Sequence, residues 1–141
     1  MRRGWVPPRS PYSLIQEDLW PSEWAILVSC MMLNCTSRKQ VEKVLPEFLR
    51  RWPNARQFTT APVAEVVELC RPLGFANRRT VNLKKMTEAY LAGGWQHARE
   101  LPGIGEYGAA AWEIFCRGTL PEEAPKDHAL VLYYHWLKER K

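Results

Sequence analysis

Hydrophobic side chains recur through this sequence at helical spacing, and no segment alternates hydrophobic and polar residues in the manner of a strand. The segment Trp24–Leu33 is hydrophobic on nearly every side and follows Ser22, a residue suited to capping a helix. We expect it to form a buried helix at the centre of the protein. Ser37 and Gln40 form a capping-box pattern that begins the next helix, which Pro46 should bend or close early.

Shorter hydrophobic stripes predict further helices. Residues 13–20 should form a short one, and Thr60 is expected to cap another. The predicted buried positions of that helix are Val63, Val66, Val67 and Leu69. Residues 77–91 should form an amphipathic helix that two glycines end. Its predicted core positions are Val81, Leu83, Met86, Tyr90 and Leu91. An aromatic-rich helix over residues 130–137 comes last, so the predicted fold class is all-α.

Prolines and arginines dominate residues 1–12, which predicts an extended N-terminal arm anchored by Trp5. The chain of 141 residues is long enough for one hydrophobic core and too short for two ordinary domains. Hydrophobic residues make up 46% of it, which argues against global disorder. Residues 1–141 are therefore expected to form a single domain.

Basic residues outnumber acidic ones, which gives a formal net charge of +5. They concentrate at 2–9, 38–56 and 78–85, a distribution that favours a polyanionic partner but is equally typical of a solvated basic face. No hydrophobic run approaches the ~20 residues of a membrane span, and no signal-peptide core follows the N-terminal arginines. We expect an intracellular protein without a membrane partner.

The cysteines show neither a C-x-x-C spacing nor a zinc-binding pattern with the histidines. They are Cys30, Cys35, Cys70 and Cys116. Buried free thiols are the default expectation for such cysteines, and no metal site is predicted.

The sequence Leu101–Gly105, Leu-Pro-Gly-Ile-Gly, joins a tight turn to a new helix, whose partner before the turn is expected over residues 97–101. Pro102 fixes φ, while Gly103 and Gly105 allow backbone angles and close approaches that a side chain forbids. The free N–H groups of the following helix lie beside this turn, an arrangement that binds phosphate. The alternative is an ordinary turn between helices whose glycines only relieve steric conflict.

This hairpin, followed by a loop with Gly118, Pro121 and Pro125 and then by Asp127, resembles the signature of the helix-hairpin-helix DNA glycosylase superfamily. The chain is particularly similar to the thymine and uracil mismatch glycosylases of that superfamily. The similar stretches extend over nearly the whole chain: 7–11, 33–37, 71–74, 103–108, 114–116 and 127–128. The resemblance implies two helical lobes with the hairpin and Asp127 meeting in the cleft between them. Some members hold a four-cysteine iron–sulfur cluster beyond this point, but no cysteine follows Cys116, so no cluster is expected.

The resemblance also implies roles for particular residues. Asp127 would stabilise the developing sugar cation and activate water, with helix capping as its alternative role. Tyr107 stands where bifunctional relatives carry a lysine, which predicts hydrolysis without strand cleavage. Tyr107 would contact the flipped base unless it only packs on the core. Gln16 resembles a residue that reaches the base pocket, with a surface glutamine as the alternative, and Lys126 is expected to point away from the cleft.

DNA contacts are implied for the hairpin and for two loops. The hairpin residues are Leu101, Pro102, Gly103, Ile104, Gly105 and Gly108. Cys35 would plug the gap left by the flipped nucleotide, where relatives carry an arginine. Phe75 would act as a wedge, with ordinary loop packing against the core as the alternative. Ala129 likewise replaces a lysine. Both departures make uracil a safer predicted substrate than thymine.

The sequence thus predicts a monofunctional DNA glycosylase acting on uracil, thymine or a 5-substituted uracil mispaired with guanine. Its partner would be double-stranded DNA with a mismatched or damaged base. It would act as a monomer without a cofactor, in the nucleus of a eukaryote or the cytoplasm of a prokaryote. Two alternatives stay open. One is a non-enzymatic helix-hairpin-helix DNA-binding module in which Asp127 is only a cap, and the other is a glycosylase for adenine or alkylated bases.

Overall fold

The computed structural model describes residues 1–140, and these residues form helices and loops without a strand. The α-helices are α1 (Ile15–Leu19), α2 (Glu23–Leu33), α3 (Arg38–Arg51), α4 (Ala55–Phe58), α5 (Val63–Cys70), α6 (Ala76–Ala92), α7 (Glu106–Trp112) and α8 (His128–Glu139). The 3₁₀ turns η1 (Arg71–Leu73) and η2 (Ala98–Glu100) and the π-helical segment η3 (Glu113–Arg117) complete the regular structure of the described residues. The all-α prediction is confirmed.

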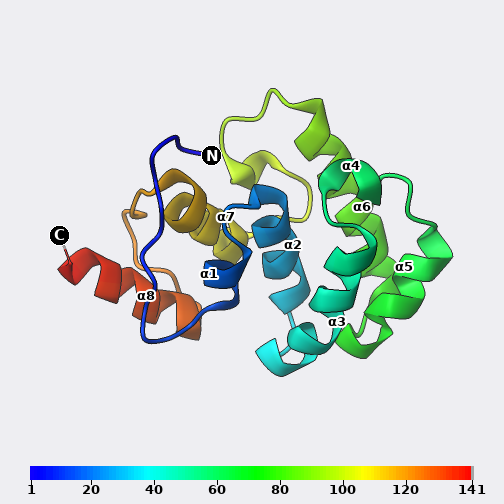
Figure 1. Ribbon diagram of the computed structural model, residues 1–141, viewed down its shortest axis with the longest axis horizontal. Helices are drawn as coiled ribbons and strands as arrows, with labels where there is room; N and C mark the ends of the chain where they lie inside the picture. The colour runs from blue at the N-terminus through cyan, green and yellow to red at the C-terminus, as the bar shows by residue number, and fades with distance from the viewer. Residues whose placement is uncertain (141) are drawn as a thin grey trace.

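Helix α2 lies at the centre of the molecule, with α1 and α7 on one side and α3 and α6 on the other (Figure 1). Ser22 caps this helix by accepting a hydrogen bond from the Ala25 N–H at 3.2 Å. Ile26, Leu27 and Val28 are completely buried, because a helix that is hydrophobic on nearly every side is stable only inside the protein. The predicted central helix is confirmed.

Helix α3 begins where the capping residues predict. The Ser37 hydroxyl accepts the Gln40 N–H at 3.2 Å, but the Gln40 side chain donates to the Pro72 carbonyl at 3.5 Å instead of completing the capping box. The helix continues through Pro46 to Arg51, so the proline does not close it.

Aromatic side chains fill the space between α2, α3 and α4. Trp24 stacks on Phe48 with ring centroids 6.0 Å apart, and Phe58 lies 5.0 Å from Phe48. Helix α4, which supplies Phe58, has only 4 residues and is too short for a hydrophobic repeat to reveal. Lys84 of α6 fixes the end of α4 by donating to the carbonyls of Phe58 and Ala61 at 2.8 and 2.7 Å.

Some expectations for α5 and α6 are wrong. Thr60 does not cap α5, since its hydroxyl donates to a carbonyl of α4 at 2.8 Å and Pro62 stands at the N-cap of α5. Val63, Val81 and Leu91 are not in the core but are 57%, 48% and 39% exposed. In α6 the inward positions are taken by Thr80 and Thr87, whose hydroxyls donate to backbone carbonyls of the same helix. Val81 therefore faces outward.

The segment before α1 is held by contacts with η3. Trp5 Nε1 donates to the Phe115 carbonyl at 3.0 Å, and the Arg2 N–H donates to the Cys116 carbonyl at 2.8 Å. Gly118 ends η3 with a φ of +68°, and a Cβ there would lie 2.5 Å from the Trp5 ring. The absence of a side chain at Gly118 therefore allows the helix to end there and leaves room for the Trp5 ring.

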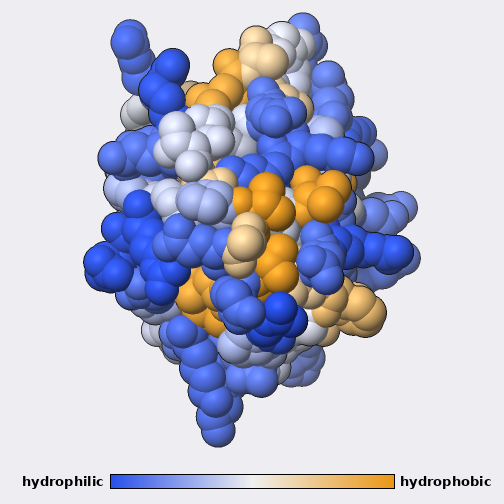
Figure 2. Space-filling view, turned by 90° about the vertical axis from the view of Figure 1, so that its right-hand side faces the viewer, coloured by the Kyte–Doolittle hydropathy of each residue, from blue (hydrophilic) through white to orange (hydrophobic). Residues whose placement is uncertain are grey.

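Hydrophilic side chains cover most of the face at the right of Figure 1, where α5 lies, with an interrupted band of hydrophobic ones across its middle (Figure 2). Within residues 1–140 no helix is both long and hydrophobic enough to cross a membrane. The most exposed large hydrophobic side chain of this part is Phe75, at 70%, in the turn before α6.

Candidate active site

The predicted hairpin is present, but its first helix is only the 3₁₀ turn η2 in place of the helix expected over 97–101. The turn Leu101–Gly105 leads directly into α7, and no side chain caps α7 at Gly105. The first N–H groups of α7 are therefore available to an anion beside the turn.

The three hairpin positions 103, 105 and 108 differ in why glycine fits there. Gly103 has a φ of +81°, and a Cβ there would lie 2.8 Å from the Met31 side chain. A Cβ at Gly108 would lie 3.1 Å from Ile104. At Gly105, by contrast, a Cβ would meet no atom within 4 Å. The positive φ thus explains Gly103, and Gly108 leaves little room for a side chain beside Ile104, while the backbone at Gly105 stays open for a close approach.

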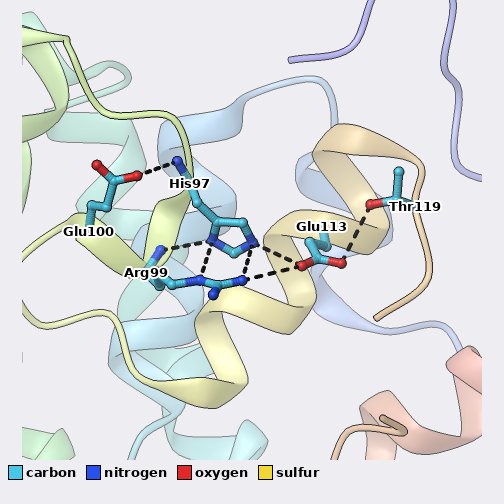
Figure 3. A network of polar contacts seen from close by, with 5 residues as sticks. All are labelled: His97, Arg99, Glu100, Glu113 and Thr119. Atoms are coloured by element: carbon cyan, nitrogen blue, oxygen red, sulfur yellow. Dashed lines mark hydrogen bonds and ion pairs between the residues drawn. The ribbon is translucent and has the colours of Figure 1, made fainter. Parts of the chain in front are cut away.

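A polar network ties the start of the hairpin to η3 (Figure 3). The Glu100 carboxylate accepts the His97 N–H at 2.9 Å, and His97 Nδ1 accepts the Arg99 N–H at 3.1 Å. Because Nδ1 is an acceptor, neutral His97 carries its proton on Nε2, which donates to Glu113 at 2.9 Å. Thr119 donates to the other Glu113 oxygen at 3.5 Å. Glu113 therefore connects the first residues of the loop after η3 with the start of the hairpin.

Asp127 stands at the N-cap of α8. Its Oδ2 accepts the N–H groups of Ala129 and Leu130 at 3.1 and 2.9 Å, while Oδ1 accepts no hydrogen bond from residues 1–140. The half-buried side chain lines a cavity of about 1080 Å³ together with Gly105 and Tyr107. Helix capping therefore uses one carboxylate oxygen and leaves the other free beside the hairpin.

Charged residues border the same cavity. Lys126, next to Asp127, is one of them, and the direction of its amine stays a prediction. The others are Arg99, Glu106, Glu113, Glu122 and Glu123. No group of three or more His, Cys, Asp or Glu side chains in the described part of the chain is arranged to hold a metal ion.

Tyr107 contacts a buried polar cluster on α1 and α2. Gln16 is 1% exposed and donates to the Tyr107 hydroxyl oxygen at 2.8 Å, so the alternative of a surface glutamine is wrong. Its amide nitrogen also lies 3.5 Å from Ser29 Oγ and 3.6 Å from Cys30 Sγ. Burial, together with the nearby Cys30 and Asp127, raises the pKa of Tyr107, and burial raises the pKa of Cys30 to about 12. Both groups therefore stay protonated and neutral at physiological pH.

Glu17 fixes the orientation of α1, a role that the sequence analysis missed. Its buried carboxylate accepts the N–H groups of Ser10 and Leu14, both at 2.8 Å, and the Ser10 hydroxyl at 2.6 Å. Leu14 is the N-cap of α1, and a glutamate three positions later is a recognisable capping signal. Because these bonds fix the rotation of α1, Gln16 faces α7.

Cys35 and Phe75 border a second cavity, of about 190 Å³, together with Gly103 of the hairpin. Both residues have positive φ, 59° and 51°. Phe75 is largely exposed, so the alternative that it packs against the core is wrong. Cys35 is also exposed, unlike the other three cysteines, and the default of a buried thiol fails for it. The predicted plug and wedge thus lie at one site, although their roles stay predictions.

An all-α fold, a glycine-rich hairpin and a carboxylate at the start of the helix after the hairpin are together features of a helix-hairpin-helix repair protein. Residues 28–134 match the family described as HhH-GPD superfamily base excision DNA repair protein, and the chain belongs to this family. The family membership predicted from the hairpin is confirmed.

Two relatives are similar over most of the chain. A methyl-CpG-binding domain protein 4-like protein of Arabidopsis thaliana is 39% identical over 136 residues, which cover 96% of this chain and 31% of the relative. A thymine-DNA glycosylase of Aeropyrum pernix is 42% identical over 91 residues, which cover 60% of this chain and 41% of the relative. The chain thus spans less than half the length of either relative.

The fold is shared with a solved structure of a thermostable thymine-DNA glycosylase. The TM-score is 0.65 at 21% identity, and the similar region covers 79% of this chain and 52% of that chain.

Proposed function

We propose that this chain is a monofunctional DNA glycosylase that hydrolyses the N-glycosidic bond of uracil, thymine or a 5-substituted uracil mispaired with guanine. The observation that carries the proposal is the Asp127 carboxylate, which lines the cavity beside the hairpin, caps α8 through Oδ2 and leaves Oδ1 without a hydrogen-bond donor from residues 1–140. Family membership and the similarity to a thymine-DNA glycosylase support this activity. We further propose that residues 1–141 act as one domain and as a monomer, in the nucleus of a eukaryote or the cytoplasm of a prokaryote.

In this proposal the mismatched duplex is held by the hairpin and by the two turns that contain Cys35 and Phe75. The open backbone at Gly105 and the first N–H groups of α7 bind a phosphate of the damaged strand. Phe75 enters the duplex as a wedge and Cys35 fills the space left by the flipped nucleotide, which the cavity that both residues border supports. The formal net charge of +5 adds sequence-independent attraction to DNA.

The flipped base enters beside Tyr107 and Gln16, and Asp127 acts on the sugar. As the bond from C1′ to the base nitrogen breaks, its electron pair leaves with the base and positive charge develops on the sugar. The negative charge of Asp127 stabilises that cation. The free oxygen then accepts a proton from a water molecule whose oxygen bonds to C1′. The departing base anion takes up a proton and Asp127 returns its own to solvent, so the products are the free base and an abasic site.

Two features limit the reaction. Tyr107 has no amine, so it forms no Schiff base with the sugar, and strand cleavage does not follow hydrolysis. Cys35 and Ala129 each replace a cationic side chain of the resembled glycosylases, which weakens contacts with the orphan base and phosphate. Uracil, which lacks the thymine methyl group, is therefore the preferred base.

A panel of duplexes tests this proposal. The duplexes contain U·G, T·G, 5-hydroxymethyluracil·G, adenine opposite 8-oxoguanine, or an alkylated purine, and abasic sites are detected as strand breaks after alkali treatment. We expect the largest excision rate for U·G and a smaller one for T·G. If the protein excises only adenine or only the alkylated purine, and none of the pyrimidines, the proposed substrate is wrong. Tight DNA binding without any excision identifies a non-enzymatic binding module.

A further inference from the structure

Arg79 of α6 is a buried cation whose every N–H group has a backbone partner. The side chain is 9% exposed, and its guanidinium donates to five carbonyl oxygens at 2.7 to 3.4 Å. These are the carbonyls of Met31, Met32, Asn34, Leu73 and Gly74. Five N–H groups are all that a guanidinium has, so the hydrogen-bonding capacity of Arg79 is used completely within the protein.

The five carbonyls come from two segments that are distant in sequence. Three belong to the C-terminal end of α2, whose last carbonyls lack partners within the helix and attract a cation. The other two belong to η1 and the glycine after it. Arg79 thus joins the end of α2 to the turn before α6.

The residue that follows each segment is strained. Cys35 comes directly after Asn34 and Phe75 directly after Gly74, and both have a positive φ, which is unfavourable for a residue with a side chain. Such conformations persist only where the surrounding structure imposes them. The Arg79 hydrogen bonds hold the carbonyls immediately before both positions.

We propose that Arg79 is a positioning residue that locks the Cys35 turn and the Phe75 turn into one rigid unit, so that both enter the duplex in a fixed relation. This inference rests on the proposed function, in which these turns hold the gap left by a flipped nucleotide. Arg79 borders the same cavity as Cys35 and Phe75, but its N–H groups are all bonded to backbone carbonyls, so it acts on the duplex through the two turns. A lysine cannot replace it, since three donors on one nitrogen do not reproduce the planar arrangement of five.

Excision kinetics test the proposal with Arg79→Lys. We expect single-turnover excision from a U·G duplex to fall at least about fivefold, the lower end of what one stacked base contributes, with little loss on the same uracil in single-stranded DNA. In a Phe75→Ala background the Arg79→Lys change should have a clearly smaller effect on the duplex, because only the Cys35 turn is then left for it to displace. Equal losses on both substrates, or full additivity with Phe75→Ala, overturn the proposal.

Lys84 provides a matched control on the same helix. It also donates to backbone carbonyls, those of Phe58, Thr59 and Ala61, but at the end of α4, where neither turn takes part. Lys84→Met should lower the melting temperature and change excision from duplex and single strand by the same factor. A selective loss on the duplex in this variant shows that general destabilisation explains the Arg79 result, and the proposal fails.

Hydrogen exchange on the unmodified protein tests the coupling without any activity and without a variant that has to fold. The Thr36 N–H is bonded to the Leu33 carbonyl and the Gly74 N–H to the Arg71 carbonyl, one in each turn. If Arg79 joins the turns, both amides should exchange through one opening event, with the same dependence on low denaturant concentrations. Separate opening events overturn the proposal. A protein with coupled turns that excises no base refutes the proposed function instead.

Discussion

Gln16 donates its side-chain amide to the Tyr107 hydroxyl oxygen at 2.8 Å, across a sequence separation of 91 residues. This bond joins α1 to the first turn of α7, directly beside the hairpin. Because Gln16 is buried and Tyr107 is partly buried against the core, their geometry is maintained by packing as well as by the bond.

A double-mutant cycle measures this contact. Tyr107→Phe should lower the free energy of unfolding by about 1–3 kcal/mol, because the buried Gln16 amide loses its short hydrogen bond. In a Gln16→Leu background the same change should have almost no effect, since no amide is then left without a partner. Urea denaturation provides both values. An equal loss in the two backgrounds contradicts the contact.

The absence of an amine at position 107 predicts hydrolysis without lyase activity. Borohydride added during excision of uracil should trap no covalent complex between protein and DNA. Lys126 borders the cavity of Asp127 and is the amine to examine if an adduct appears. An adduct that survives Lys126→Ala refutes the argument from Tyr107, while one that disappears identifies Lys126 as its source.

Phe75→Ala separates a wedge from a structural role. Since the ring is 70% exposed, the melting temperature should change little. Excision from paired duplex should fall about 5-fold to 100-fold, because stacking on the wedge is lost only where a base is held out of the helix. The same uracil in a bulge or a single strand should be excised nearly as before. A uniform loss on all three substrates indicates a folding defect.

Buried thiols predict that stability falls at alkaline pH. Burial raises the pKa of Cys30 to about 12 and that of Cys70 to about 11, from an ordinary value of 9.0. Above pH 9.0 the unfolded chain loses these protons while the folded protein keeps them, which favours unfolding. The contribution is thus complete below pH 9.0 and disappears progressively up to about pH 12.

Melting temperatures across that range check the alkaline prediction, and a thermal stability unchanged up to about pH 11 contradicts it. Ellman's reagent supplies a control. In the folded protein it should react at mildly alkaline pH with Cys35 alone, since the other three thiols are buried, and with all four after denaturation.

Local signals in the sequence predicted the parts of the fold that depend on local chemistry. Ser22 and Ser37 cap their helices because a hydroxyl before a helix has one obvious partner, and the hairpin glycines are likewise recognisable from their spacing. Helix α4 has too few residues for a periodic pattern, and the outward rotation of Val81 depends on what α6 packs against.

In the candidate site, too, some residues were recognisable from the sequence and others depend on the tertiary structure. Asp127 was recognisable from its place after the hairpin and loop, and its capping role from residue type. The burial of Gln16 was not, because it depends on Glu17 fixing the rotation of α1. Nothing in the sequence pattern distinguishes Arg79 from the exposed Arg78, since only the tertiary structure brings five carbonyls to one of them.

Asp127→Asn provides the most direct measurement of whether this carboxylate performs the chemistry. Asparagine keeps an oxygen to accept the Ala129 and Leu130 N–H groups, so the melting temperature and the affinity for a U·G duplex should stay close to those of the unmodified protein. Excision should fall at least about 100-fold, because the charge that stabilises the sugar cation and the base that activates water are both lost. Excision of uracil at a nearly unchanged rate by this stably folded variant contradicts the assignment of Asp127 and makes Glu106 or Glu123 the next carboxylate to examine.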